Sequence, residues 1–276
     1  MNINLLTDAP KHNLALMKIS AYHKAQGDNV YLMGVGCFDK TYASWLFDFS
    51  QKGVANIKGG AAVEDSVLPP EIESMKPDYS LYGLDFSLGY TFRPCYRGCP
   101  FCKVPKMNHP DKEHHSIWEF HNPKFNTIEL LNNNTFFDPR WKETFEEIWD
   151  AELTVREHGF DLRLLDDEKA EALRCTRFDG CIHYAWDKMQ DEKKILEGLK
   201  IAPRGRVYVL IGFDTTEEED LYRCQKIVDH GHDPYIMPFT RTGKEKRFKR
   251  FIDTFMWRKH KTIKEAWNNY KKCRGE

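Results

Sequence analysis

The residues of this chain that are best suited to chemistry are three cysteines with the spacing Cys-x3-Cys-x2-Cys, namely Cys95, Cys99 and Cys102. Three thiolates on one short loop can bind three irons of a cubane [4Fe-4S] cluster, whereas a cluster that only carries electrons normally has four cysteine ligands. The next cysteine along the chain is Cys175. The spacing therefore predicts a cluster with one iron that has no protein ligand, and an open iron is a place for chemistry.

The residues around the cysteines predict where this loop lies. Residues 85–92 alternate in the manner of a β-strand, and Arg93, Pro94, Gly98 and Pro100 then interrupt regular structure. We therefore expect the loop just past the carboxyl end of a strand.

With Phe101 directly before the last cysteine, the loop resembles the signature of the radical S-adenosylmethionine (radical SAM) enzymes. The resemblance implies a partial (β/α)6 barrel with the cluster at its top and S-adenosylmethionine bound to the open iron. Reductive cleavage of this cofactor would give a 5′-deoxyadenosyl radical that abstracts hydrogen from a substrate not identified by the sequence. The other cysteines lack compact spacing, so one cluster is expected.

The sequence after the loop alternates between strand-like and helix-like segments, as such a barrel requires. We expect strands at 126–131, 160–165, 181–186, 206–212 and 233–238, and helices at 139–158, 166–174, 191–199 and 216–230. This alternation implies a parallel sheet, and active sites in such barrels gather at the carboxyl ends of the strands.

The first part of the chain is expected to be a separate, small, parallel α/β domain over residues 1–68. Its pattern predicts strands at 3–6 and 29–34 and helices at 14–23 and 41–52, a βαβα order typical of a three-layer unit. Residues 69–80 contain several prolines and are predicted to be a linker, followed by the barrel over residues 81–240.

This first domain also resembles, over residues 13–20, the cobalamin-binding-type domain that precedes the barrel in one branch of radical SAM enzymes. An Asp-x-His-x-x-Gly run, which would supply a histidine to cobalt, is missing from the sequence. We therefore expect a degenerate domain that does not bind cobalamin.

The resemblance further implies contacts with S-adenosylmethionine. Asn132, Asn133 and Asn134 follow the second strand, where the family holds the amino group of the cofactor; an asparagine-rich turn is the alternative. Arg163, on the expected third strand, could form a two-pronged contact with a carboxylate, or a salt bridge inside the barrel.

Two later strands provide the other expected contacts. Either His183 or Tyr184 must face the barrel interior, because side chains alternate along a strand, although plain packing is an equal possibility. Ile211 and Gly212 end the fifth strand, where the family packs adenine, and Gly212 permits close approach. An ordinary turn at the strand end is the alternative for Gly212.

Other interpretations of the cysteine loop remain open. The three cysteines with His109, His114 and His115 could form a structural Cys3His zinc site. The protein would then be a zinc-stabilised nucleic-acid-binding protein without catalysis. Reduced core cysteines would not explain three thiols so close together among Arg, Gly and Pro.

The composition predicts a folded protein of a reducing compartment. The chain has 276 residues, 41% of them hydrophobic, and eight cysteines, three of which are clustered, so metal binding is favoured over disulfides. Neither a membrane span nor a secretory signal is evident in the sequence. We expect a cytoplasmic protein, and the resemblance implies a reductant such as a flavodoxin or ferredoxin as partner.

The carboxyl-terminal segment, residues 241–276, differs in charge, with thirteen Lys or Arg against four acids. Phe248, Phe251, Phe255 and Trp257 interleave with these bases, which predicts a basic amphipathic helical segment packed on the barrel. A nucleic-acid contact is the alternative, and it makes a nucleotide or RNA substrate a hypothesis.

Overall fold

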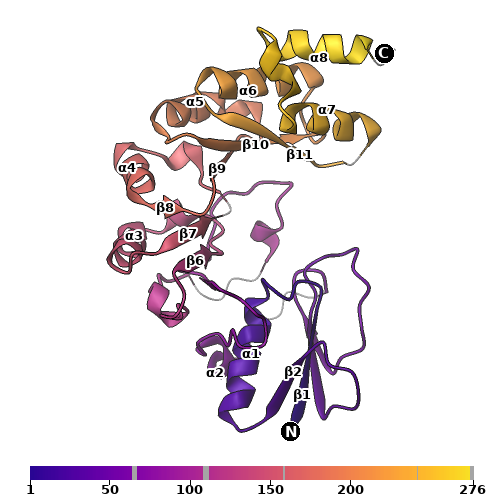
Figure 1. Cartoon of the computed structure of the whole chain (residues 1–276), viewed down its shortest axis with the longest axis vertical. Helices are drawn as coiled ribbons and strands as arrows, with labels where there is room; N and C mark the ends of the chain where they lie inside the picture. Colours follow the sequence, from indigo (N-terminus) through magenta and orange to yellow (C-terminus); the bar gives the residue numbers. More distant parts are fainter. Residues whose placement is uncertain (64–66, 108–111, 158, 241, 274–276) are drawn as a thin grey trace. The chain divides into compact units, whose positions relative to one another are not determined.

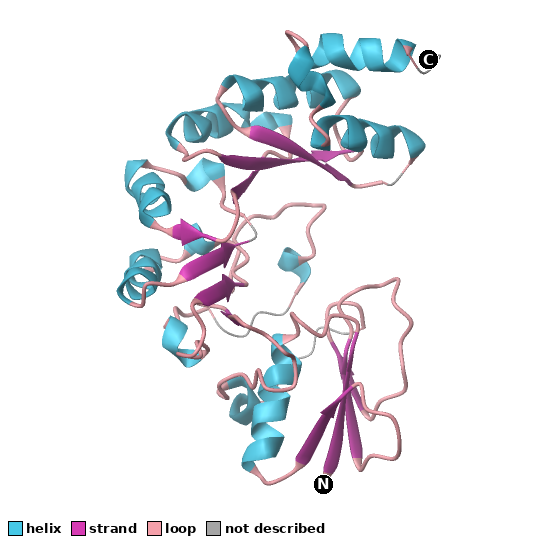
Figure 2. Ribbon diagram, in the orientation of Figure 1, coloured by secondary structure: helices cyan, strands magenta, loops and turns pink. Residues whose placement is uncertain are grey.

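The computed structural model describes residues 1–63, 67–107, 112–157, 159–240 and 242–273. It divides into two compact units, one formed by Met1–Asn133 and Lys142–Val155 and the other by Asn134–Trp141 and Arg156–Glu276. Helices are interspersed among the strands, and every strand pair of known register in the described residues is parallel (Figures 1 and 2). The predicted α/β class with parallel sheets is confirmed.

The amino-terminal sheet has the order β2-β1-β3-β4. Its strands are β1 (Asn2–Thr7), β2 (Asn29–Leu32), β3 (Lys40–Ser44) and β4 (Ile57–Gly59), and helix α1 (Leu14–Ala25) connects β1 to β2. Ile3 and Leu5 of β1 are completely buried with Leu16 and Met17 of α1, because a strand and an amphipathic helix each bury one apolar face. The predicted strands and first helix are confirmed.

The predicted helix at 41–52 is wrong. Tyr42 to Ser44 belong to β3, which pairs in parallel with β1. The apolar residues that suggested a helix do not share one buried face, since Trp45 is buried whereas Phe49 is 84% exposed. Pairing with the free edge of β1 has overridden the helical spacing, so the unit has the order β1-α1-β2-β3-β4 instead of βαβα.

The segment predicted to be a linker, residues 69–80, is packed in the first unit. It contains the short helix α2 (Pro70–Glu73), and Ile72 and Tyr79 are buried in the core formed with α1. The Tyr79 hydroxyl donates to the Phe120 carbonyl at 2.8 Å and accepts from the Leu88 amide at 3.1 Å. These residues therefore have structural roles beyond connection.

A second sheet has the order β5-β6-β7-β8, with β5 (Ser87–Gly89), β6 (Thr127–Leu130), β7 (Thr154–Glu157) and β8 (Arg177–Phe178). Helix α3 (Trp141–Asp150) lies between β6 and β7. The 3-10 turns η1 (Val104–Lys106) and η2 (Ile117–Glu119) lie between β5 and β6, and η3 (Thr135–Phe137) follows β6. The predicted strand at 126–131 is confirmed.

The third strand was predicted at the wrong position. The expected helix at 139–158 ends at Asp150, Glu152 has a positive φ of 52°, and β7 then begins at Thr154. Residues 162–164 form the 3-10 turn η4 (Leu162–Leu164), because the Asp161 carboxylate accepts from the Arg163 amide at 3.1 Å. This competing local bond keeps Arg163 out of a strand.

The third sheet has the order β11-β10-β9 and lies within the second unit. Its strands β9 (Ile182–Ala185), β10 (Gly205–Ile211) and β11 (Asp233–Pro238) match the prediction, as do helices α4 (Asp167–Cys175), α5 (Glu192–Ile201) and α6 (Glu217–Asp229). A capping box between Thr216 and Glu219 begins α6.

The carboxyl-terminal residues form α7 (Gly243–Asp253), the 3-10 turn η6 (Met256–Lys259) and α8 (Ile263–Lys272). Phe248, Phe251 and Trp267 are buried while most of the basic side chains are outside. This confirms an amphipathic helical segment.

The described strands form three sheets. Their arrangement as one partial barrel, and the domain boundaries predicted at residues 68, 80 and 240, stay predictions. No helix in the described residues combines the length and apolar character needed to span a membrane.

Candidate functional site

The cysteine loop follows β5 and has neither helix nor strand from Tyr90 to Lys103. Cys95, Cys99 and Cys102 are partly buried, and none is in a disulfide. The Cys102 amide donates to the Cys99 carbonyl at 3.1 Å, which makes a tight turn. The Val104 amide donates to Cys102 Sγ at 3.4 Å, a type of contact that stabilises a thiolate and tunes a cluster.

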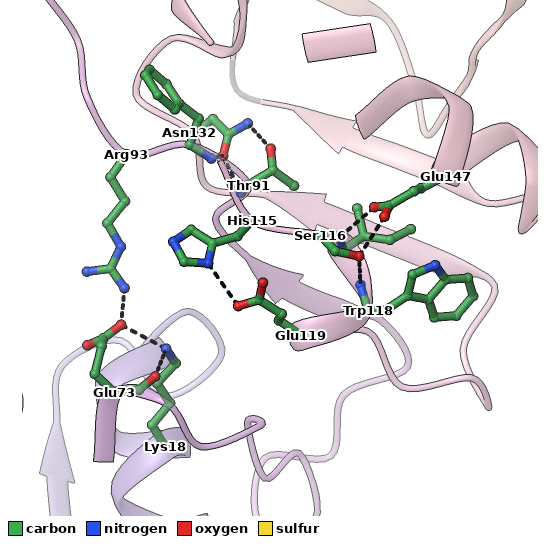
Figure 3. Close-up of polar contacts among 12 residues, drawn as sticks. Lys18, Glu73, Thr91, Arg93, His115, Ser116, Trp118, Glu119, Asn132 and Glu147 are labelled. Atoms are coloured by element: carbon green, nitrogen blue, oxygen red, sulfur yellow. Dashed lines mark hydrogen bonds and ion pairs between the residues drawn. The ribbon is translucent and has the colours of Figure 1, made fainter. Parts of the chain in front are cut away.

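Asn132 fixes the segment that enters the loop. Its Oδ1 accepts from the amides of Thr91 and Phe92 at 2.9 and 3.1 Å, and its Nδ2 donates to the Thr91 hydroxyl at 2.9 Å (Figure 3). Asn132 and Thr91 are both buried, so these bonds satisfy backbone groups that water cannot reach. The partner Thr91 was not recognised from the sequence.

Asn133 adds a second attachment, since its Nδ2 donates to the Arg93 carbonyl at 2.6 Å. Two neighbouring amides thus hold the three residues that precede the loop. Asn132 and Asn133 are therefore positioning residues for the cysteines, and their contact with a cofactor stays a prediction.

A pocket of about 320 Å³ lies beside the entrance to the loop, within the first unit. Its charged and polar lining comes from α1, α2, the loop entrance and η2: Lys18, Glu73, Tyr90, Arg93, His115 and Glu119. The sequence prediction missed this pocket. One signal was present, because Lys18 lies one turn after Leu14 on a helix face that is otherwise apolar.

The charges around this pocket are arranged in two groups. Glu73 Oε1 accepts from Lys18 Nζ at 2.8 Å and also from Arg93 Nη2 (Figure 3). His115 Nδ1 is bonded to Glu119 Oε2 at 2.9 Å. Burial raises the pKa of Tyr90, against whose ring the Arg93 guanidinium lies at 4.8 Å.

The segment with His115 is held from both sides. The His115 backbone amide donates to the Thr91 carbonyl at 2.8 Å. Glu147 on α3 accepts from the Ser116 hydroxyl at 2.6 Å and from the Ile117 amide at 2.8 Å (Figure 3). The His115 side of the pocket is therefore fixed by a carboxylate from a distant part of the sequence.

Apart from Phe101, the remaining predicted contacts lie in the second unit. Asn134 Nδ2 donates to Asp161 Oδ2 at 3.2 Å, and its buried Oδ1 has no hydrogen-bond partner among the described residues. Arg163 is bound twice by Asp161, at 2.7 and 3.1 Å, and once by Asp191, at 2.7 Å. Burial opposes the charge of Arg163, but these bonds and charges raise its pKa. The structure thus shows the internal salt bridge that was the alternative for this residue.

His183 and Tyr184 point to opposite faces of β9, as strand alternation requires. Tyr184 is buried and donates to the Pro203 carbonyl at 2.9 Å. The His183 ring is stacked on Tyr208, with centroids 5.0 Å apart.

Ile211 is buried at the end of β10, and Gly212 follows with a positive φ of 73°. A Cβ at position 212 would overlap the Glu245 carboxylate. The positive φ, which residues with a Cβ rarely adopt, therefore explains this glycine, and the Glu245 carboxylate packs against it. Phe101 is partly buried in the cysteine loop.

Asp187, which follows β9, is a titratable group that the sequence prediction missed. Burial raises its pKa to about 6, although the positive charges of Arg163 and Arg223 act in the opposite direction. No local pattern marks this aspartate, because the shift depends on what packs around it.

The sulfur donors of the loop are spread over separate positions. Among the described residues, no three His, Cys, Asp or Glu side chains are grouped so as to hold one metal ion, and His109 lies outside those residues. A cubane cluster instead uses one thiolate on each of three irons. Three thiols on one loop, outside disulfides and with an amide donated to Cys102, fit that chemistry.

No family model, curated protein or solved structure matches this chain. The function is therefore argued from the chain's own residues.

Proposed function

We propose that this protein is a radical SAM enzyme. The observation that carries the proposal is the Cys-x3-Cys-x2-Cys loop at the carboxyl end of β5, with its entrance held by Asn132 and Asn133. Parallel strands alternating with helices support the family's partial (β/α)6 barrel as the fold.

In this proposal Cys95, Cys99 and Cys102 hold a [4Fe-4S] cluster. When bound, the cluster and S-adenosylmethionine together supply a 5′-deoxyadenosyl radical for hydrogen abstraction. The protein's part is to position these groups and exclude water. The bonds from Asn132 keep the loop entrance in one conformation, and the Val104 amide withdraws electron density from Cys102 Sγ.

Contacts with S-adenosylmethionine are proposed for Phe101, Asn134, Arg163, His183, Ile211 and Gly212. The Arg163 guanidinium already donates three bonds to Asp161 and Asp191, so the cofactor's carboxylate would have to compete with these two acids for it. Asn134 Oδ1 is an acceptor of this set that has no partner in the described part of the chain. A flavodoxin or ferredoxin is the proposed reductant, and the cytoplasm the proposed location.

The test is anaerobic purification followed by iron and sulfide analysis, then reduction with S-adenosylmethionine present and assay for 5′-deoxyadenosine. We expect a brown protein with about four irons per chain that forms 5′-deoxyadenosine. A variant with all three loop cysteines changed to alanine should do neither.

The matched control changes Cys175 and Cys273 to alanine, since both are exposed and lie outside the loop. It should keep iron and activity. A colourless wild-type protein that holds zinc would overturn the proposal and favour the zinc-stabilised nucleic-acid-binding protein.

A further inference from the structure

The pocket beside the cysteine loop has an apolar wall as well as charged groups. Leu14, Met75 and Phe120 line it together with the residues described above. A Cβ at position 89 would overlap the Phe120 ring, so Gly89 is required for this wall to approach β5. Its volume of about 320 Å³ is at the lower end of small-molecule sites. The pocket can accept a ligand with a compact apolar body.

The cationic side of the pocket has unused donors. Lys18 and Arg93 share one oxygen of Glu73, and their side chains are 13% and 22% exposed. The bond to Glu73 uses one N–H of the Arg93 fork, and no acceptor among the described residues takes the others. A largely buried guanidinium with free donors suits an oxyanion, because charge-assisted, two-pronged bonds are among the strongest polar contacts.

The second polar group of the pocket, His115 with Glu119, determines how a bound molecule is oriented. The His115 ring faces the pocket and is bonded to Glu119, whose side chain is 59% exposed (Figure 3). An anionic group is attracted to Lys18 and Arg93 and repelled by the Glu119 carboxylate. The anionic end of a ligand should therefore lie against Arg93 and its neutral or cationic end toward His115.

We propose that this pocket binds a small molecule carrying an oxyanion, either a carboxylate or a phosphate, with the anion on Arg93 and Lys18 and the apolar body against Phe120. Arg93 is two residues before Cys95, which places the molecule next to the cysteine loop. If the protein has the proposed function, this molecule is the substrate. That identification rests on the proposed function, whereas the binding itself does not.

The test measures binding of three probes to the full chain by calorimetry and ligand-observed NMR. Phenyl phosphate and benzoate carry the two oxyanions on the same ring, and benzyl alcohol is the neutral comparison. We expect at least one oxyanion to bind at least tenfold more tightly than benzyl alcohol. The probe that binds tells phosphate from carboxylate recognition.

Variants locate the binding. Lys18→Met should weaken the preferred probe at least tenfold, whereas Lys24→Met, on the same helix but paired with Asp78 outside the pocket, should not. Ser74 is exposed and lines the pocket, so Ser74→Trp should block binding without changing a charge. This variant keeps the test decisive if Lys18→Met does not fold.

Equal binding of all three probes, no binding of either oxyanion at millimolar concentration, or full binding by Ser74→Trp would each overturn the inference. Oxyanion binding that depends on Lys18, in a protein that has no iron, would support the pocket while the proposed function fails. An iron protein that makes 5′-deoxyadenosine but binds no probe would support the proposed function and overturn the inference about the pocket.

Discussion

The cysteine loop entrance in the first unit and the ends of the strands in the second unit both contain polar side chains, but these side chains have different partners. At the loop entrance, Asn132 and Asn133 bind the backbone, and Arg93 retains donors directed to a pocket. In the second unit, Arg163 is surrounded by Asp161 and Asp191, and Arg223 is completely buried with Asp220.

This difference separates groups that hold the fold from groups that are available to a ligand. A charge that is bonded to several partners inside the protein stabilises one conformation, and removing its partner is costly. A charge with unused donors at a pocket keeps its bonding capacity for another molecule. The structure therefore favours Arg93 over Arg163 as a residue that binds an anion without rearrangement.

The largest expected effect concerns Arg223. Its guanidinium donates to the carbonyls of Trp186 and Leu210, both at 2.7 Å, and to Asp220 at 2.5 Å. Arg223→Met should lower the free energy of unfolding of the second unit by about 3–5 kcal/mol, because a buried carboxylate loses its partner. Hydrogen exchange resolved by segment would measure this.

A double variant and a control variant test the prediction for Arg223→Met. Adding Asp220→Leu to Arg223→Met should restore part of the stability, since the unpaired acid is then absent. Arg174→Met removes an exposed arginine of the same unit and should change stability by about 0.5 kcal/mol or less. Similar losses from Arg223→Met and Arg174→Met would contradict a structural role for the buried charge.

The second effect concerns Asn132 at the loop entrance. Asn132→Leu leaves the buried amides of Thr91 and Phe92 without the Asn132 acceptor, which should cost about 2–6 kcal/mol at about 1–3 kcal/mol per unsatisfied group. Iron content after anaerobic purification should fall below half of the wild-type value. Urea unfolding and iron analysis measure the two parts.

Asn268→Leu is the control, because this asparagine is exposed on α8; it should preserve both stability and iron. Wild-type iron content in a folded Asn132→Leu protein would show that the cysteine loop does not depend on the Asn132 amide.

The smallest effect concerns Asp187, whose pKa is raised from 3.8 to about 6, chiefly by burial. The folded state favours the protonated acid, so its contribution to stability is complete below about pH 4 and is lost as the pH rises to about 6. Above pH 6, the free energy of unfolding of Asp187→Asn should exceed that of the wild type by about 3 kcal/mol, at about 1.4 kcal/mol per pKa unit, and below about pH 4 the two should be nearly equal.

Urea unfolding at several pH values would test this, with the exposed Asp229→Asn as control. A stability difference between Asp187→Asn and wild type that does not change from pH 4 to 7 would contradict the burial of this acid. It would also weaken the contrast between the bonded charges inside the second unit and the donors that line the pocket of the first unit.

The elements that could be predicted were those with a strong local pattern. The strand at 206–211 alternates buried valines and isoleucine with half-exposed residues, and α6 begins with a capping box visible in the sequence. The helix expected at 41–52 failed because β1 offered an open edge, and the strand expected at 160–165 failed because Asp161 caps a 3-10 turn. Both errors have causes that the periodicity of hydrophobic residues does not reveal: tertiary strand pairing in the first case and a side-chain cap in the second.

The sequence by itself determined the three-cysteine loop, the alternation of strands and helices, and the basic amphipathic end, because each depends on residues that are neighbours along the chain. Only the tertiary structure decided that Asn132 serves the loop entrance, that Arg163 is occupied by two aspartates, and that Lys18, Arg93 and His115 line one pocket. Lys18 and His115 are far apart in sequence, and hydrogen bonding and electrostatics act over a few ångströms in space. Their meeting is therefore a property of the fold.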